Sequence, residues 1–420
     1  MIGTGEKADV SAIQSGAPDA YRVIRAALTS SLFLVACMGI VTDTSRIRLA
    51  GRGSQWMMAF AFLAMASAIY SVGAFISLWK GFEVMTLVLV AISLAGQLRT
   101  SEDLSWLMNV ACLMLLYILL TVYVGLALYP SEAIKHAEYL GVRGLVPGLN
   151  PSSVGSIAAL LLVSAVGVLL HRWPSKKKTA GIWAVLLAAV GGLFLAHSRT
   201  PIFAATAAIM VLLLAGRHYR FAILTALIGT ALVLALSVGD ILDYFYRGQS
   251  QNVLISLTGR MYFWEDLVWP KIASSPILGH GYYAAHRVLF GVSGVDNAYL
   301  EVLLGLGFLG LSVFLIPVFL AMMALVRTRP KSSTPSINKL LWGQIMAIFA
   351  IIVIRAYTAP AFEVQHPLLV FYMLAQIGTA ALLRLQIEKK PAVAAITKNV
   401  NGKPVLHRKG QSRVMPYQGR

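Results

Sequence analysis

The sequence predicts an all-α, polytopic integral membrane protein with about 11 (10–12) transmembrane helices and one large periplasmic loop. Of its 420 residues, 58% are hydrophobic and 12% are charged, with a mean hydropathy of +0.74. Soluble chains carry roughly 25% charged residues. This composition excludes a soluble enzyme and a DNA-binding protein despite the net charge of +18. Cys37 and Cys112 each lie inside an apolar run, which excludes a secreted disulfide scaffold.

The helices are predicted from apolar runs, because a helix needs about 20 such residues to cross a bilayer. Backbone polar groups must be paired in lipid, so these runs are expected to be helices and not strands. The runs cover 26–42, 56–75, 78–97, 104–128, 152–171, 181–197, 201–215, 219–238, 297–325, 339–358 and 365–384. The runs 181–197 and 201–215 are short and are expected to form a bent pair.

Lysine and arginine counts in the short loops predict the orientation. The tail 385–420 carries eight Lys and Arg against one acid, Glu388, and alternate loops are also basic. The tail is therefore assigned to the cytoplasm, and the long loops 129–151 and 239–296 to the periplasmic side. The helix count then puts the N-terminus outside, whereas Arg22 and Arg25 favour the inside.

One membrane domain, 26–384, is expected between a polar N-terminal segment, 1–25, and the basic cytoplasmic tail, 385–420. Residues 34–37 (Leu-Val-Ala-Cys) resemble a lipoprotein cleavage box. The favoured interpretation is a cysteine midway along the first spanning helix. The sequence shows no internal repeat.

The first polar feature is Ser198-Arg199-Thr200-Pro201, between two of the predicted helices. An arginine inside a spanning helix costs roughly 2.5–3.5 kcal/mol on insertion scales. Arg199 is therefore a candidate functional residue. The alternative is an arginine that reaches to the interface while Pro201 opens the next helix.

The second feature combines Gly259-Arg260-Met261-Tyr262-Phe263-Trp264-Glu265 with the run from Pro276 to Tyr283, which contains His280. Arg260 opens an amphipathic stretch with Phe263, Val268 and Ile272 on one side. The Pro-Ile-Leu-Gly-His-Gly run then breaks the helix and demands glycine backbone freedom. The alternative is an interfacial helix with an aromatic anchor.

The third feature is Asp296-Asn297-Ala298-Tyr299-Leu300-Glu301, which opens the next helix. Asp296 or Asn297 is a suitable helix N-cap. Capping does not explain an acid at Glu301, one turn into an apolar helix.

Together these features place two arginines, several acids, His280 and His286 on one outward face. The planar guanidinium suits phosphate or pyrophosphate, and a carboxylate or imidazole nearby can act as general base. The sequence has no Walker motif and no zinc spacing. We therefore expect a metal-free reaction without cofactor or nucleic acid, in which the donor is an activated lipid-linked group.

The order of motifs resembles the O-antigen ligase and Wzy-type polysaccharide polymerase superfamily, bacterial membrane glycosyltransferases of the GT-C type. The resemblance covers roughly 140–312. The resemblance rests on four motifs. They are the run from Arg143 to Pro151, Ser198-Arg199, the second feature, and the run from Asp296 to Leu300 followed by Leu306-Gly307 and Gly310.

The resemblance implies a location in the bacterial inner membrane, a periplasmic active site and sugar donors on a polyprenyl pyrophosphate carrier. The resemblance also implies that Arg199 and Arg260 bind the pyrophosphate. The family's ligases have a histidine where this chain has Asp296; Asp296, Glu301, His280 and Glu265 all remain candidates for the general base. The remaining substrate-binding candidates are Trp264, Glu265, Asn297, Tyr299 and Arg143.

The departure at Asp296 favours a polymerase of exopolysaccharide or O-antigen. It would transfer the growing glycan, with inversion, from polyprenyl pyrophosphate to a sugar hydroxyl of a lipid-linked repeat unit. A ligase that transfers glycan to lipid A-core is the nearest alternative, and a transporter or flippase of lipid-linked oligosaccharide or a non-catalytic scaffold are more distant ones. The implied partners are the lipid-linked oligosaccharide, membrane lipid, a chain-length regulator and a flippase.

Overall fold

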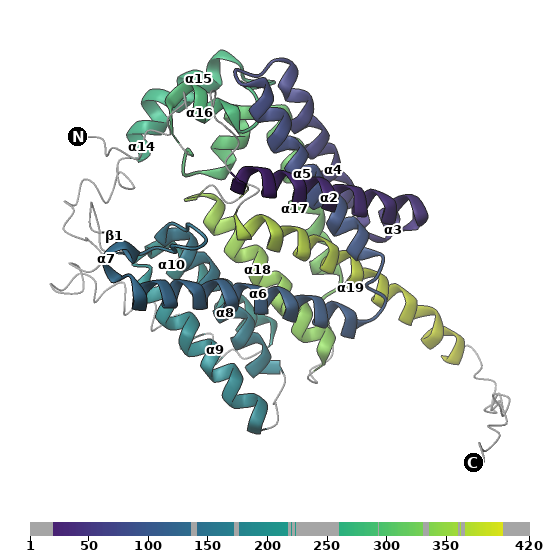
Figure 1. The fold of residues 1–420 in the computed structure, drawn as a ribbon. Helices are drawn as coiled ribbons and strands as arrows, with labels where there is room; N and C mark the ends of the chain where they lie inside the picture. The colour runs from purple at the N-terminus through teal and green to yellow at the C-terminus, as the bar shows by residue number, and fades with distance from the viewer. Residues whose placement is uncertain are drawn as a thin grey trace, which may run out of the picture.

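The computed structural model describes residues 20–135, 141–171, 176–216, 220, 223, 260–292, 294–330, 336–359, 362 and 366–397. Most of the predicted helix 219–238, most of the loop 239–296 as far as Gly259, and the ends of the chain lie outside the described residues. The part described is almost entirely helical (Figure 1).

Long helices occupy the apolar runs within the described residues. They are α2 (Ala20–Thr42), α4 (Gly51–Ala66), α5 (Ala74–Ala95), α6 (Ser101–Leu128), α8 (Pro151–His171), α9 (Lys176–Leu195), α10 (Arg199–Ala215), α17 (Ala298–Arg327), α18 (Ile337–Ala356) and α19 (Pro367–Thr397). Among the residues that the structure describes, 7 helices are long and apolar enough to cross a membrane. An all-α polytopic membrane protein is therefore confirmed.

Short elements join these helices. They are α3 (Ser45–Leu49), η1 (Ser67–Ile69), α7 (Pro130–Ala133), β1 (Ile134–Lys135), β2 (Gly141–Val142), α14 (Arg260–Phe263), the π-helical η2 (Trp264–Val268), α15 (Trp269–Ser274) and α16 (Ala284–Phe290). The two strands form a small antiparallel hairpin in the loop before α8.

The predicted helix 56–75 is wrong at its end, because α4 stops at Ala66 and the chain turns before α5. The hydroxyl of Ser71 accepts a hydrogen bond from the Gly73 N–H, which fixes this turn. The expected bent pair is instead two helices, since α9 ends at Leu195 and Ser198 has extended backbone before α10.

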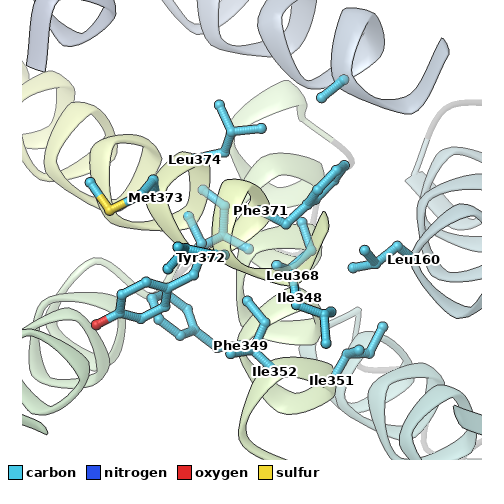
Figure 2. Packing of buried hydrophobic residues seen from close by; sticks show 14 of the residues in the cluster. Leu160, Ile348, Phe349, Ile351, Ile352, Leu368, Phe371, Tyr372, Met373 and Leu374 are labelled. Atoms are coloured by element: carbon cyan, nitrogen blue, oxygen red, sulfur yellow. The ribbon is translucent and has the colours of Figure 1, made fainter. Parts of the chain in front are cut away.

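Helices α18 and α19 lie at the centre of the bundle, with α8 and α10 against α18 and with α4, α5 and α17 against α19 (Figure 1). Figure 2 shows their contact, where Leu368, Phe371 and Tyr372 of α19 meet apolar side chains of α18. Tyr372 is completely buried. Burying apolar area of this kind contributes about 25 cal/mol per Å² in water, but within lipid the close fit of side chains is what holds helices together.

Hydrogen bonds fix the direction of the central helices. Arg355 near the end of α18 bonds to Ser156 near the start of α8, and Gln344 near the start of α18 bonds to the carbonyl of Ser164. Lys339 bonds to the carbonyl of Gly216, just after α10. The starts of α8 and α10 and the end of α18 therefore share one end of the bundle, which we call the Arg355 end.

Helix α17 is broken at Gly307, where the backbone leaves the helical region (φ 63°, ψ −167°). The Pro276–Gly281 loop enters the break. The Phe308 N–H donates to the Pro276 carbonyl at 2.7 Å, and the Gly281 N–H donates to the Gly305 carbonyl at 2.8 Å. This confirms that the Pro-Gly run breaks a helix, and it shows that the run docks onto a second one.

Candidate functional site

An ion pair between Arg260 and Asp296 lies at the Arg355 end. The Arg260 Nε is 3.2 Å from a carboxylate oxygen of Asp296, and the two side chains are 32% and 48% exposed. A charged pair with this exposure is accessible to a ligand. The Arg260 guanidinium also donates to the carbonyl of Thr358, at 3.3 Å. Two sequence features that lie far apart in the chain are thus brought together.

A second guanidinium, that of Arg355, lies behind this pair and is completely buried. It donates to the Ser156 hydroxyl at 2.9 Å, to the Ser152 hydroxyl at 2.5 Å and to the Thr358 hydroxyl at 3.2 Å. Thr358 therefore contacts both guanidinium groups. Hydrogen bonds of this number are needed, because a buried charge without them is strongly destabilising.

His366, just before α19, extends the same network. Its Nε2 lies 3.3 Å from the Ser153 hydroxyl, and its Nδ1 accepts the Leu368 N–H at 3.2 Å, so the ring proton is on Nε2. Burial, followed by the nearby charge of Arg355, lowers the pKa of His366 to about 3. The imidazole is therefore neutral at physiological pH.

The first two turns of α8 supply the three serines of this network. Asn150 precedes the helix, and its side-chain oxygen accepts the Ser153 N–H at 2.7 Å, as an N-cap does. Pro151 occupies the first helical position, which suits its missing N–H. The Asn150-Pro151 entry, at the end of the Arg143–Pro151 run, therefore begins α8 where Ser152, Ser153 and Ser156 reach the site.

The segment after Arg260 is held by Trp264, whose ring N–H donates to the Val295 carbonyl at 2.8 Å. Trp264, Val268 and Ile272 are its buried side chains. Phe263 is half-buried and packs against the same cluster, which confirms the predicted apolar side of Phe263, Val268 and Ile272 and adds Trp264 to it. Trp264 thus ties Arg260 to the loop that carries Asp296.

Asn297 is confirmed as the N-cap of α17, because its side-chain oxygen accepts the N–H groups of Tyr299 and Leu300. Asp296 adopts a left-handed backbone (φ 57°), which is uncommon outside glycine, asparagine and aspartate. Glu301 accepts the Val295 N–H at 2.8 Å. The Tyr299 hydroxyl donates to the Val353 carbonyl at 3.3 Å. The third feature thus positions Asp296.

Three other predicted residues make different contacts. The His280 Nε2 lies 2.9 Å from the Lys271 carbonyl and holds α15 against its own loop. Glu265 is exposed on η2. Arg143 is exposed and donates to the Glu132 carbonyl in the loop before α8. Neither of these two bonds involves Arg260 or Asp296.

Arg199 is the first residue of α10 and is partly buried. The helix starts beside α8, since a Cβ on Gly155 would lie 2.8 Å from the ring of Pro201. Arg199 therefore begins its helix at the Arg355 end, next to the helix that carries Ser152 and Ser156.

Among the residues that the structure describes, no group of three or more His, Cys, Asp or Glu side chains is placed to hold a metal ion. The network around the Arg260–Asp296 pair contains two guanidiniums, one carboxylate, several hydroxyls and a neutral imidazole, and Arg199 lies at the same end of the bundle. Such a set can bind an anionic phosphate group and accept a proton.

Sequence reasoning missed Arg355, Thr358 and His366. Arg355 has a signal that could have found it, because it is an arginine within the apolar run 339–358, and such residues mark functional positions in membrane proteins. Thr358 and His366 have no such signal, since their role depends on how the α18–α19 connection folds over α8.

The comparison with known families identifies this region. Residues 183–315 match the family model described as O-antigen ligase; the match contains Arg199, Arg260 and Asp296 and begins after the Arg143–Pro151 motif. No curated protein matches the chain. The match supports a membrane glycosyltransferase of ligase or polymerase type, which acts on lipid-linked oligosaccharide. Over residues 183–315, about a third of its length, the chain is therefore similar to the O-antigen ligase family.

Proposed function

We propose that the protein is a polysaccharide polymerase of the bacterial inner membrane. It transfers a growing glycan from polyprenyl pyrophosphate to a sugar hydroxyl of a lipid-linked repeat unit. The observation that carries the proposal is the accessible Arg260–Asp296 pair, 3.2 Å apart. It offers a donor fork for the leaving pyrophosphate and a carboxylate for the attacking hydroxyl within one small site.

In the proposed reaction, the acceptor hydroxyl oxygen attacks the anomeric carbon while the bond from that carbon to the pyrophosphate oxygen breaks. Asp296 takes the hydroxyl proton, and the pyrophosphate leaves with the bonding electron pair. Arg260 and Arg199 stabilise the charge that develops on the leaving group. Fixed hydrogen-bond donors of this kind stabilise a transition state strongly. Removal of one oxyanion-hole donor, for comparison, raises the activation free energy by about 2.7–4 kcal/mol.

Arg355 is proposed to position Arg260 through Thr358. Its guanidinium is surrounded by the serines of α8, which leaves its own donors occupied. Its positive charge also disfavours protonation of His366, so the network stays neutral around it. Arg355 is therefore a positioning residue in this proposal.

The periplasmic placement of the site is supported by the basic residues at the other end of the bundle. Arg46 bonds to Ser93 near the end of α5, and Arg384 bonds to the carbonyls of Ala95 and Leu98. Basic residues favour the cytoplasmic side. The Arg355 end then faces the periplasm, and the C-terminus faces the cytoplasm.

The test measures lipid-linked oligomers in membranes that express Arg260→Ala or Arg260→Lys at matched protein levels. We expect both variants to lose chain growth by about 10²-fold or more, since a lysine cannot reproduce the fork. Lys271→Gln is the control, because it removes an exposed cation on the nearby α15. Normal polymer length with Arg260→Ala would overturn the proposal.

A ligase is the alternative, and the same measurement of glycans in a gene deletion distinguishes it from a polymerase. If the gene is deleted and single repeat units persist while long chains vanish, the protein is a polymerase. If long chains accumulate on the carrier and never reach lipid A-core, it is a ligase with Asp296 in the histidine position.

A further inference from the structure

A second group of basic side chains lies between α2, α5 and α16. Its centre is Glu83, a buried acid of α5. Arg25 of α2 forms an ion pair with one carboxylate oxygen of Glu83, and the Lys80 Nζ lies 2.9 Å from the other. The Trp79 ring N–H donates to the same carboxylate at 3.1 Å. Two cations therefore share this one carboxylate.

A third cation, Arg287 of α16, joins them through the ring of Tyr283. The Arg287 guanidinium carbon is 4.6 Å from the ring centroid, and the Lys80 Nζ is 4.8 Å from it. Arg287 also donates to the Tyr283 hydroxyl at 2.7 Å. Within the described part of the chain, its Nε is buried without a hydrogen-bond partner, and no carboxylate pairs with it. We call Arg25, Lys80, Glu83, Tyr283 and Arg287 the Arg287 cluster.

The Arg287 cluster lies at the same end of the molecule as the first site. Ser77, one turn before Lys80, donates to the carbonyl of Tyr282, and the Tyr282 hydroxyl lies 3.5 Å from the carbonyl of Phe362. Phe362 belongs to the connection that follows Arg355 and Thr358. The two basic groups therefore flank the same connection.

Lipid can approach the Arg287 cluster along α2. Apolar side chains beside Arg25 are exposed on this helix, among them Ile24 at 59% and Leu28 at 60%. The side chains of Arg25 and Lys80 are 27% and 11% exposed. Cations at the edge of an apolar helix face are placed for the phosphate of a lipid whose tail lies on that face.

A small cavity lies between the two basic groups. It is lined by Tyr283 and His286 on the side of α16, and by Ala298 and Glu301 on the side of α17, with Phe362 beside them. Glu301 accepts the N–H of Val295, the residue before Asp296. The cavity, about 20 Å³, has room for about one water molecule, so it marks the space between the two groups and is too small for a sugar ring.

We propose that the Arg287 cluster is a second binding site for a lipid-linked pyrophosphate, that of the acceptor. This inference rests on the proposed polymerase function, in which the donor and the acceptor are both lipid-linked and must be bound together. Arg260 and Arg199 hold the donor's pyrophosphate. Arg287, Lys80 and Arg25 hold the acceptor's pyrophosphate, at the same end of the molecule as Asp296.

The experiment counts bound ligand by native mass spectrometry on the purified full-length protein, with geranylgeranyl pyrophosphate as the probe. We expect two probe molecules on the wild type, one on Arg287→Gln, one on Arg260→Ala and none on the double variant. The second binding event should weaken about tenfold or more in Arg287→Gln, as expected for a lost charge-assisted hydrogen bond. Lys271→Gln is the charge-matched control and should bind two.

Arg287→Lys is a second variant, less disruptive to folding than Arg287→Gln, because it keeps the positive charge and loses only the planar guanidinium. It should bind the second probe with an affinity between those of the wild type and Arg287→Gln. A single probe on the wild type, or two on Arg287→Gln, would overturn the proposal. Displacement of the second probe by phosphatidylglycerol at equal concentration would also overturn it, since the occupant would then be a phospholipid headgroup.

The failure of this inference can be told apart from the failure of the proposed function. If Arg260→Ala keeps normal polymer but Arg287→Gln loses one probe, the polymerase assignment fails and the second site stands as a pyrophosphate site. If Arg260→Ala loses polymer and Arg287→Gln still binds two probes, the second site fails alone.

Discussion

Ser152 in the first turn of α8 accepts a hydrogen bond of 2.5 Å from Arg355, which lies 203 residues later in the chain. The contact joins the Asn-Pro entry of α8 to the end of α18. It gives this entry a physical reason: the cap at Asn150 begins the helix where its first turn can hold a buried guanidinium. That guanidinium in turn contacts Thr358, which contacts Arg260.

The first prediction concerns these serines. Ser152→Ala and Ser156→Ala each remove one acceptor of a buried charge, and we expect each to lower the free energy of unfolding by about 1–3 kcal/mol. Ser164→Ala is the control on the same helix, since its hydroxyl donates to the Leu160 carbonyl one turn earlier and is not an acceptor of the Arg355 guanidinium. Thermal unfolding in detergent measures the difference. Equal Tm values for Ser156→Ala and Ser164→Ala would contradict the role given to Arg355.

The second prediction concerns the break in α17. Gly307 has a backbone conformation that is almost restricted to glycine, and a Cβ there would lie 2.2 Å from the backbone of Ile277. We expect Gly307→Ala to expel the Pro276–Gly281 loop and to reduce the amount of folded protein in membranes severely. Gly181→Ala is the control, because a Cβ at Gly181 meets nothing within 4 Å. Similar amounts of both variants would show that the loop does not depend on this break.

The third prediction separates the charge of Asp296 from its backbone. Asparagine also tolerates the left-handed conformation, so Asp296→Asn should keep a Tm close to that of the wild type. If Asp296 accepts the proton, removal of its carboxylate in Asp296→Asn should slow chain growth by about 10²–10⁴-fold. Asp296→Val should lower both Tm and activity, because a β-branched residue is strained there. Full activity in Asp296→Asn would assign the base to another residue, with Glu301 the next candidate.

The apolar runs predicted most of the fold because each long helix must be apolar over its own length, which is a local property. The Asn297 cap and the break after Ser274 are local as well. The site is not local. Arg355 looks like one arginine at the end of a helix until α8 packs against it. In the sequence, Arg25 counts as a basic residue that favours a cytoplasmic N-terminus. In the structure it is paired with Glu83, so it no longer supports that orientation.

The last prediction concerns pH and His366. The pKa of His366 is about 3 in the folded protein and near 6.5 in an unfolded chain. Between these values the unfolded chain binds a proton that the folded protein does not. The free energy of unfolding should therefore be highest above pH 6.5 and should fall as the pH drops toward 3. His366→Gln removes this titration, so its Tm should fall less between pH 7 and pH 5 than that of the wild type. Other groups titrate in both proteins, and the difference between the two slopes is the measured quantity. Parallel slopes would mean that the pKa of His366 is the same in the folded protein and in the unfolded chain, so that the ring is not buried beside Arg355.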